Sequence, residues 1–250
     1  MIQNNGPHEI DYDCELSVQL NQCFNNQVEL INSVNNMPLS IIYNNLFLKY
    51  ESAEKFILLD DDTEISVSFV QTIKSGYADL EVPKIISSSD RQIYYPICED
   101  AVVTCDKDLD PISVLSIGSG LIINRTLIEK FNRHNLKLFD ENYALYGVDY
   151  SLFRRIHQIS GEGESIKIRT SSFLVHSLSR LDDSLKKNKF RNIERALDVA
   201  ITARRYPTFH LHYLLIRKFV AESMRMNWNN AYNIVKVYLL GRHPRCLKKY

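Results

Sequence analysis

Three consecutive aspartates, Asp60, Asp61 and Asp62, follow a short apolar run in the stretch "FILLDDDTEIS". Adjacent carboxylates repel one another, and beside a buried segment their charges cost free energy unless a counter-charge is present. Two carboxylates one residue apart can share a hard divalent cation, and that cation can bridge the phosphates of a nucleotide. The alternative is a solvated loop in which Asp62 or Thr63 caps a helix that begins near Glu64. We favour the metal site, with one of the three acids free to act only as a cap.

The apolar run before these acids predicts where they lie. Lys55–Leu59 is short, continuous and stopped by charge, as expected of a buried parallel strand. Ligands of open α/β sheets bind at the carboxyl ends of the strands. The acids are therefore expected at the edge of a sheet where a ligand site forms.

Strand-like and helical stretches alternate along the rest of the body. We expect strands in "RQIYYPICED", in "ESIKIRTSSFLVHS", and in "VLSIGSGLIIN", where Gly118 and Gly120 interrupt the strand. Helices are expected around Leu16–Phe24, over 37–50, from near Asn124 or Thr126, and over 150–159. A further helix is expected after the aspartates, with Ile65, Phe69, Val70 and Ile73 on one face and Gly76 as C-cap. This alternation predicts an α/β layer architecture.

The last 70 residues differ from this body in periodicity and charge. From Leu181 onward the apolar spacing is helical, with a break at Pro207. From Arg180 to the end there are 16 Lys and Arg residues and 5 Asp and Glu residues, whereas the first 179 residues carry 14 and 25. We therefore divide the chain into a body over residues 1–180 and a basic helical region over 181–250.

The basic region predicts an anionic partner. Its basic residues are not interleaved with aromatic stacking motifs or zinc knuckles, so nucleic acid is not expected as a partner. A membrane surface or a phosphorylated substrate fits better, and for the last basic residues a solvated tail is the alternative. The residues expected to touch anionic lipid are Arg242, Arg245, Lys248 and Lys249.

Composition excludes several classes of protein. A chain of 250 residues, 45% of them hydrophobic, with only 8 Gly and 7 Pro, can bury a sizeable core and is neither disordered nor fibrous. No stretch approaches the roughly 18 uninterrupted apolar residues of a membrane span, and "MIQNNGPHEI" lacks the features of a signal peptide, so a cytoplasmic location is expected. The cysteines are odd in number and lack CxxC spacing, which predicts free thiols at Cys14, Cys23, Cys98, Cys105 and Cys246.

Two classes of enzyme place acids directly after an apolar strand. Haloacid-dehalogenase-type phosphatases require DxDx followed by Thr or Val, but here Glu64 takes that place and the hydroxyl of Thr63 comes one position too early. No later apolar strand ending in paired acids supplies their second metal site. The other class, nucleotide-sugar-dependent glycosyltransferases, fits the sequence better.

Several stretches resemble family 2 glycosyltransferases with the GT-A fold, in the family's order over roughly residues 1–180. "FILLDDDTEIS" resembles the strand that bears the DxD motif, "GSGLIINRTLIEKF" the glycine-rich strand that leads into a helix, "FDENYALYGVDYSLFRRI" the "FDE…ED" segment, and "FLVHSLSR" the late strand that delivers a His. "IQNNGP" looks like the end of the family's second strand. The resemblance implies a GT-A-like fold, a Rossmann-like mixed sheet flanked by helices, here without the family's usual first strand and helix.

The resemblance also implies roles for particular residues. Asp60 and Asp62 match the outer acids of the DxD, with Asp62 as direct ligand of Mg²⁺ or Mn²⁺ on the donor diphosphate and Asp60 near the ribose or a metal-bound water. His176 matches a position that reaches the metal or the pyrophosphate, and its alternative is a structural histidine. Asp149 matches the general base that deprotonates the acceptor hydroxyl. Its alternative is a helix N-cap, because only the central acid of the family's "EDxD" run is present here.

The remaining matched residues are expected to bind the two substrates. Gly118, Ser119 and Gly120 would let the backbone approach the sugars closely, with a bulge as the alternative. Asp140 and Glu141 are expected to shape the acceptor side, and Asn4, Asn5 and Asp61 to contact the donor.

The resemblance thus implies a metal-dependent, inverting glycosyltransferase that moves a sugar from a nucleoside-diphosphate sugar to a hydroxyl of a growing glycan. Cell-surface polysaccharide, O-antigen or lipopolysaccharide would be the type of product, and a lipid-linked saccharide at the inner face of the membrane the type of acceptor. The absent first strand favours an alternative, a non-catalytic remnant that binds nucleotide or assists another transferase.

Overall fold

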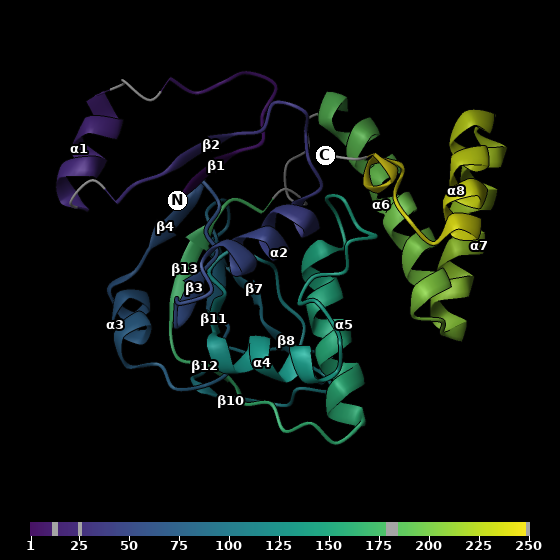
Figure 1. The fold of residues 1–250 in the computed structure, drawn as a ribbon. Helices are drawn as coiled ribbons and strands as arrows, with labels where there is room; N and C mark the ends of the chain where they lie inside the picture. Colours follow the sequence, from purple (N-terminus) through teal and green to yellow (C-terminus); the bar gives the residue numbers. More distant parts are fainter. Residues whose placement is uncertain (12–14, 25–26, 179–184, 249–250) are drawn as a thin grey trace.

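The computed structural model describes residues 1–11, 15–24, 27–178 and 185–248 (Figure 1). Its architecture is α/β, with short mixed sheets flanked by helices. The strands are β1 (Ile2–Asn4), β2 (Leu30–Asn32), β3 (Lys55–Ile57), β4 (Thr63–Ile65), β5 (Leu80–Glu81), β6 (Lys84–Ser87), β7 (Ile93–Tyr95), β8 (Ile97–Cys98), β9 (Ala101–Val102), β10 (Lys107–Leu109), β11 (Ile122–Asn124), β12 (Ile168–Thr170) and β13 (Phe173–His176). The helices are α1 (Glu15–Cys23), α2 (Leu39–Lys49), α3 (Val67–Ser75), α4 (Arg125–Arg133), α5 (Val148–Gly161), α6 (Leu185–Arg205), α7 (Phe209–Met224) and α8 (Trp228–Leu240), followed by a 3₁₀ turn over Pro244–Leu247.

Two sheets form the centre of the body. The five-stranded sheet has the order β10-β12-β5-β11-β3, and the four-stranded sheet the order β4-β13-β6-β7. In each sheet one central pair is parallel, β12 with β5 and β13 with β6, and the other neighbours are antiparallel. Val82 N–H donates to Arg169 O at 2.8 Å and Lys84 N–H to Ser172 O at 2.9 Å. The β5–β6 and β12–β13 segments therefore run side by side through both sheets and join them.

The strand before the aspartates differs from its prediction. β3 lies at an edge of the five-stranded sheet and pairs antiparallel with β11, so the predicted parallel neighbour at Lys55–Leu59 is wrong. The strand is covered nonetheless, because α2 packs over it and the rings of Phe47 and Phe56 meet edge to face at 4.8 Å. A continuous apolar run indicates that a strand is buried, but it does not indicate the direction of the neighbouring strand.

The helix predicted to begin near Glu64 begins later in the structure. Thr63–Ile65 forms β4 and pairs antiparallel with β13. α3 starts directly after Ser66, whose Oγ accepts a hydrogen bond from Phe69 N–H at 3.1 Å and caps the helix. Ile65, predicted on the apolar face of that helix, lies in β4 and is exposed. The aspartates therefore precede a strand and cap no helix.

Two predicted strands are each divided in the structure. "RQIYYPICED" contains β7 and β8, which belong to different sheets and are separated by Pro96 after a cis peptide bond. "ESIKIRTSSFLVHS" contains β12 and β13, which Ser171 and Ser172 separate. The helices predicted around Leu16–Phe24 and over 37–50 and 150–159 are confirmed as α1, α2 and α5, although their ends differ by a few residues.

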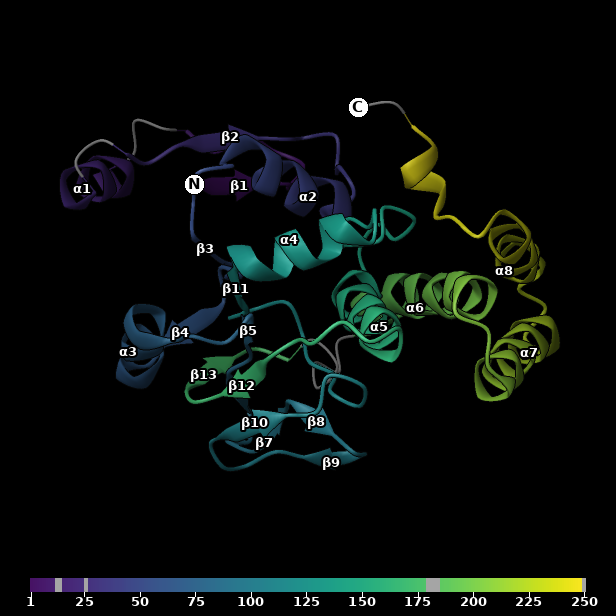
Figure 2. The same cartoon turned by 60° about the horizontal axis from the view of Figure 1, so that its bottom comes forward.

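Two groups of buried side chains hold the layers together. The larger one joins the five-stranded sheet to α2, α4, α5, α6 and α8, and the smaller one joins the four-stranded sheet to α3 and β11. Figure 2 shows α2 and α4 together on one side of β5, β11 and β12. Representative members of the larger group are Phe47, Leu80, Leu121, Phe131, Phe153 and Ala200; the smaller group contains Phe69, Ile85, Tyr95, Ile122, Leu174 and Leu178. The sheets are thus covered by helices, which leaves the strand ends open for a site.

The predicted break at Pro207 is confirmed, because it falls between α6 and α7. α6 attaches the C-terminal helices to the body: Leu197 and Ile201 are buried in the same group of side chains as Phe153 of α5. α7 and α8 pack against α6 and against each other. None of the helices in the described part of the chain is long and apolar enough to cross a membrane.

The cysteines among the described residues carry free thiols, as predicted. They are Cys23, Cys98, Cys105 and Cys246, of which Cys98 and Cys246 are buried. Cys14 lies outside the described residues.

Candidate metal centre and active-site cavity

The three aspartates lie where the chain passes from one sheet to the other. Leu58 continues the β3–β11 pairing, since its N–H donates to Leu121 O at 3.1 Å and its carbonyl accepts from Gly120 N–H at 2.6 Å. The chain then leaves the five-stranded sheet and enters the four-stranded sheet as β4. The acids therefore occupy the link between the two sheets, at the carboxyl end of β3, as the sequence predicted.

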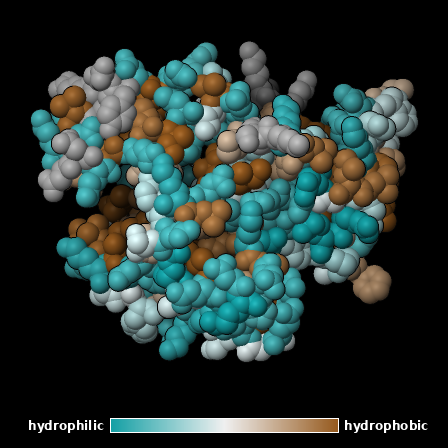
Figure 3. Space-filling model, viewed as in Figure 1, coloured by the Kyte–Doolittle hydropathy of each residue, from teal (hydrophilic) through white to brown (hydrophobic). Residues whose placement is uncertain are grey.

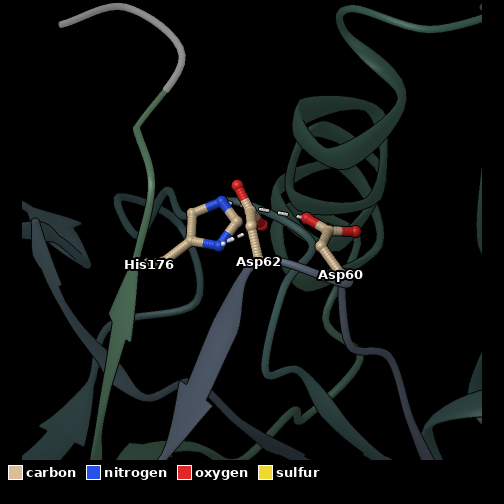
Figure 4. A group of neighbouring side chains, drawn as sticks. All are labelled: Asp60, Asp62 and His176. Carbon is tan, nitrogen blue, oxygen red and sulfur yellow. Dashed lines mark ion pairs between the residues drawn. The ribbon is translucent and has the colours of Figure 1, made fainter. Parts of the chain in front are cut away.

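Asp60, Asp62 and His176 come together at this link (Figure 4). His176 Nδ1 lies 3.1 Å from Asp62 Oδ1, and His176 Nε2 lies 3.9 Å from Asp60 Oδ2. One potential ligand atom from each residue lies within 4.8 Å of the others. The cause is strand register, because antiparallel pairing of β4 with β13 sets His176 directly opposite Thr63, the residue after Asp62. Residues more than 100 positions apart thus form one group.

The hydroxyl groups of Thr63 and Ser119 contact the residues of this group. Thr63 Oγ1 lies 3.0 Å from His176 Nδ1 and 2.7 Å from Ser119 Oγ, which in turn accepts from Asp60 N–H at 3.3 Å. A His176 tautomer with its proton on Nδ1 donates to this hydroxyl or to Asp62 and leaves the Nε2 lone pair toward Asp60. Hydrogen bonds of this kind orient metal-ligating histidines. Ser119, predicted to approach a sugar, is buried and instead orients the acids and the histidine.

A cavity of about 740 Å³ connects this group with Asp149. That volume falls in the range of about 300–1,000 Å³ typical of small-molecule sites. Its walls are built from α2, the aspartate link, the strand ends and helices α5, α6 and α7. The lining residues include Tyr43, Asp60, Asp61, Asp62, Tyr95, Gly118, Tyr146, Asp149, Tyr150, His176, Arg195, Asp198 and Lys218. The structure therefore brings the predicted metal ligands and the predicted base into one space.

Asp149 lies in the first turn of α5, and its carboxylate faces Gly118. A Cβ at residue 118 would lie 2.5 Å from Asp149 Oδ1, so only glycine leaves room for this approach. Burial raises the pKa of Asp149 to about 7; the negative charge of Asp60 acts in the same direction, and a hydrogen bond from the Gly118 backbone opposes it. Asp149 is not the N-cap of α5, because Gly147 occupies that position with φ 78°. The helix-cap alternative for Asp149 is therefore wrong.

Asp60 shares this electrostatic environment. Burial raises its pKa, the charge of His176 lowers it, and the charges of Asp62 and Asp61 raise it further. About half of its side-chain surface, 49%, remains open, and that surface borders the cavity. The pKa of the Tyr43 hydroxyl is also raised, by burial and by the charges of Asp149 and Asp60. Negative charge thus accumulates at this end of the cavity, where a cation would be stabilised.

Other residues matched by the resemblance lie away from this cavity. Asp140 is fully buried, and its carboxylate accepts from Arg205 Nε at 2.6 Å and from Tyr206 Oη at 3.0 Å. Glu141 accepts from Lys137 Nζ at 2.7 Å and from Asn44 Nδ2 at 3.2 Å. These two acids hold the segment before α5 in place, and neither borders the cavity.

The predicted donor contacts at the end of β1 and directly after it also lie elsewhere. Asn4 Nδ2 donates to Asn32 Oδ1 at 2.6 Å and Asn5 Nδ2 to Met37 O at 2.8 Å. β1 pairs in parallel only with β2, in a two-stranded sheet separate from the two larger ones among the described residues. Gly120, with φ 85°, packs against Leu174 and Pro83, so its role is close packing between chain segments.

Several cavity residues were missing from the sequence-based set. Tyr146 precedes α5 and Tyr150 lies in its first turn, and Tyr150 Oη is 2.9 Å from Tyr95 Oη. The density of tyrosines in "NYALYGVDY" was a usable signal for an aromatic wall. Arg195 places its guanidinium 5.5 Å from the centre of the Tyr146 ring.

Asp198 carries no such signal, since it is a lone acid on a long helix. It reaches the cavity because a Cβ at Gly147 would come within 2.0 Å of its Oδ1, and glycine permits that approach. Burial raises the pKa of Asp198 to about 6, although Arg154 and a hydrogen bond from Thr202 lower it. The C-terminal helices thus contribute an acid to the cavity.

Comparison of the chain with protein-family models, with curated proteins and with solved structures found no match. The interpretation of this site therefore depends on its own geometry and chemistry.

Proposed function

We propose that this chain is a metal-dependent, inverting glycosyltransferase with a GT-A-like fold, which transfers a sugar from a nucleoside-diphosphate sugar to a hydroxyl of a glycan. One observation carries the proposal: a single cavity contains both the Asp60–Asp62–His176 group and Asp149. The first group has the chemistry to hold a cation and the second has the chemistry of a general base. The α/β architecture is compatible with the proposal, and the motif order along the chain supports it.

The donor set of the metal group fits a divalent cation. It offers two carboxylates and one imidazole, with ligand atoms within 4.8 Å of one another. Carboxylate oxygens suit both Mg²⁺ and Mn²⁺, but imidazole favours the softer transition metals, so Mn²⁺ fits this set better than Mg²⁺. When bound, the cation would offset the negative charge on the departing nucleoside diphosphate. Thr63 and Ser119 would keep the ligands oriented.

Asp149 has the properties of a base for the acceptor hydroxyl. A general base is most effective when its pKa lies near the working pH, and the pKa of Asp149 is raised to about 7. Its carboxylate would take the proton as the acceptor oxygen attacks the anomeric carbon. The attack occurs opposite the leaving diphosphate, so the configuration at that carbon inverts. Asp149 and the metal group line the same cavity, so one bound substrate pair could contact both.

Acidic and basic residues both line the cavity, which suggests how two substrates would share it. Asp60, Asp61 and Asp62 line the end assigned to the cation and the donor diphosphate. Arg195 and Lys218 from the C-terminal helices contribute positive charge elsewhere in the wall. We assign the aromatic and cationic part of the cavity to the acceptor glycan, since aromatic side chains line most small-molecule sites.

Release of nucleoside diphosphate tests this function. The full chain would be incubated with Mn²⁺ and a panel of nucleotide sugars, and Asp62→Ala is expected to lower diphosphate release at least about 100-fold. Glu64→Ala is the matched control, because Glu64 is an exposed acid two residues away that does not line the cavity, and it should leave release unchanged.

Metal binding gives a second measurement that does not depend on turnover. Mn²⁺ at about 100 times its dissociation constant stabilises a folded protein by about 2.7 kcal/mol. For a chain of this length the melting temperature should rise by about 5–10 °C. Asp62→Ala should abolish this rise and Glu64→Ala should preserve it. Mn²⁺-dependent nucleotide binding without diphosphate release from any donor would favour the non-catalytic alternative, and absence of both would refute both functions.

A further inference from the structure

α7 carries a row of exposed apolar side chains along one face. Phe209, Tyr213, Ile216 and Val220 recur at i, i+4, i+7 and i+11, which places them on one side of a helix. Their exposed fractions are 99%, 60%, 61% and 45%. None of the residues of α7 is fully buried. The row therefore lies on a helix at the rim of the molecule and faces away from the core.

α8 repeats this arrangement. Trp228, Tyr232, Val235 and Leu239 have the same spacing, with exposed fractions of 65%, 63%, 42% and 69%. The other side of α8 is occupied, since Ala231, Ile234 and Val237 are buried. Figure 3, drawn in the view of Figure 1, shows hydrophobic side chains on the surface at the right edge of the molecule, where this helix pair lies.

The two rows lie on the same side of the helix pair. α7 and α8 are antiparallel, because His212 near the start of α7 meets Tyr238 near the end of α8, with Nε2 3.3 Å from Oη. Successive residues of an α-helix are about 100° apart around the helix axis. Each row therefore lies about a quarter of a turn around its own helix from the His212–Tyr238 contact. Viewed from the N-terminus of each helix, the direction of this rotation is the same. In an antiparallel pair this places both rows on one side. We call this surface, formed by the two rows, the α7–α8 face.

Basic residues border the α7–α8 face. Arg217 follows Ile216, Lys236 follows Val235, and Arg225 lies at the turn between the helices; all three are exposed. Within residues 209–240 Glu222 is the one acid, and it pairs with Arg225 at 3.5 Å. The turn itself is apolar as well as basic, because Met224 and Met226 are exposed. The face thus combines apolar rows, aromatic rings and positive charge.

We propose that the α7–α8 face docks on an anionic lipid bilayer and lies in its interface. Helices that lie in a membrane surface combine an apolar face with Lys and Arg at its border, and anionic lipid attracts the basic residues. Trp and Tyr prefer the same interface, since their rings are apolar and their N–H or O–H groups reach water. The charge of the border selects an anionic bilayer over a second copy of this chain, whose identical face would carry the same positive charge.

This surface differs from the one predicted from sequence. Arg242 donates from Nε to Asn142 Oδ1 at 2.6 Å, and Arg245 contacts Glu194 Oε2 at 2.9 Å, so both anchor the chain end to the body. Lys249 lies outside the described residues. The α7–α8 face has the apolar area that those residues lack. Because Lys218 of α7 lines the cavity, docking through this face would keep the cavity close to the lipid surface.

Trp228 provides the measurement, because it is the one tryptophan of the chain and lies on the α7–α8 face. The full chain would be mixed with vesicles of phosphatidylcholine alone or of equal parts phosphatidylcholine and phosphatidylglycerol. With the anionic vesicles, we expect co-sedimentation and a shift of tryptophan emission to shorter wavelength, both weakened by added salt. Neutral vesicles should bind much less.

Matched variants identify the face. Phe209→Gln with Ile216→Gln should lower partitioning into anionic vesicles at least about tenfold, and Arg217→Gln with Lys236→Gln should lower it by roughly tenfold. Val67→Gln with Ile112→Gln replaces two exposed apolar residues outside the face and should leave partitioning unchanged.

Three outcomes would overturn the proposal. The first is equal binding to neutral and anionic vesicles. The second is binding without a shift in the emission of Trp228. The third is a dimer in solution that Phe209→Gln with Ile216→Gln dissociates, together with no vesicle binding, which would assign the face to a second copy. These measurements use neither metal nor nucleotide sugar, so they are independent of the proposed transferase activity.

Discussion

Asp140 and Asp149 lie in the same segment, "FDENYALYGVDY", but their surroundings have opposite effects on their charge. Asp140 is fully buried, yet Arg155 and Arg205 lower the pKa of its carboxyl below the usual range despite the cost of burial. Two guanidinium groups therefore neutralise it permanently. Its charge stabilises the fold and is not available to a substrate.

Asp149 has no comparable cation beside it among the described residues. Burial and the charge of Asp60 raise its pKa, and only a backbone hydrogen bond from Gly118 opposes them. Burial and the charges of Asp62 and Asp61 likewise raise the pKa of Asp60, and the charge of His176 opposes them. An acid whose charge is not matched by fixed cations can accept a proton or a mobile cation, whereas an acid held by two arginines can do neither. This contrast separates the structural acid from the candidate functional acids.

The largest effect is expected from removing the structural acid. Asp140→Ala leaves Arg155 and Arg205 without their buried partner and should lower the free energy of unfolding by about 3–5 kcal/mol, as measured by urea denaturation. Asp108→Ala is the control, because this acid is exposed and pairs with Arg169 at the surface, so the change should stay within about 0.5 kcal/mol. A loss below about 1 kcal/mol for Asp140→Ala would show that its ion pairs contribute little to the fold.

Asp149→Asn should lower activity strongly without lowering stability. Diphosphate release should fall by about 10²–10⁴-fold, since the proposed general base is lost. Stability should not fall, because a carboxylate that is unfavourable in the folded state is removed. The variant should instead gain stability. Because the size of this gain depends on pH, it gives a measurement that is independent of turnover.

The sign of the pH dependence follows from the raised pKa. Between the unfolded value of about 3.9 and the folded value of about 7, native Asp149 binds more proton than unfolded Asp149, so its contribution to stability decreases as the pH rises through this window and is constant above it. Asp149→Asn should therefore gain stability relative to the parent chain as the pH rises from about 4 to 7, by at most about 4 kcal/mol. Urea denaturation near the two ends of this window measures the difference. Glu64→Gln, which removes an exposed acid outside the cavity, is the control variant, and an equal effect of Asp149→Asn at both ends would contradict the raised pKa.

The smallest effect is expected at the glycine that faces the base. The new methyl group of Gly118→Ala would lie 2.5 Å from Asp149 Oδ1, so the carboxylate must shift, and diphosphate release should fall by roughly tenfold with at most about 1–3 kcal/mol of lost stability. Gly161→Ala, in the last turn of α5, meets no atom within 4 Å and should stabilise the chain by up to about 1 kcal/mol. Equal behaviour of the two variants would indicate that the position of Asp149 is not important.

Local signals in the sequence correctly placed the features that depend on neighbouring residues. The apolar run before the aspartates predicted a covered strand ending in acids, the helical periodicities of α2 and α5 were visible, and the break at Pro207 lies between α6 and α7. These features follow from side-chain periodicity and backbone chemistry over a few residues. The α/β class followed from the same signals.

Tertiary structure decided which acids share a site. Asp140 and Asp149 lie nine positions apart, and Asp140 is structural because Arg155 of α5 and Arg205, on a helix far along the chain, both pair with it. His176 joins the aspartates through the register of β4 with β13, and Asp198 reaches the cavity through the packing of α6 against Gly147. The sequence alone determined that carboxylates follow a strand. The charges and strands that surround each of them come from distant segments, so local patterns could not show which would be neutralised and which would remain available for chemistry.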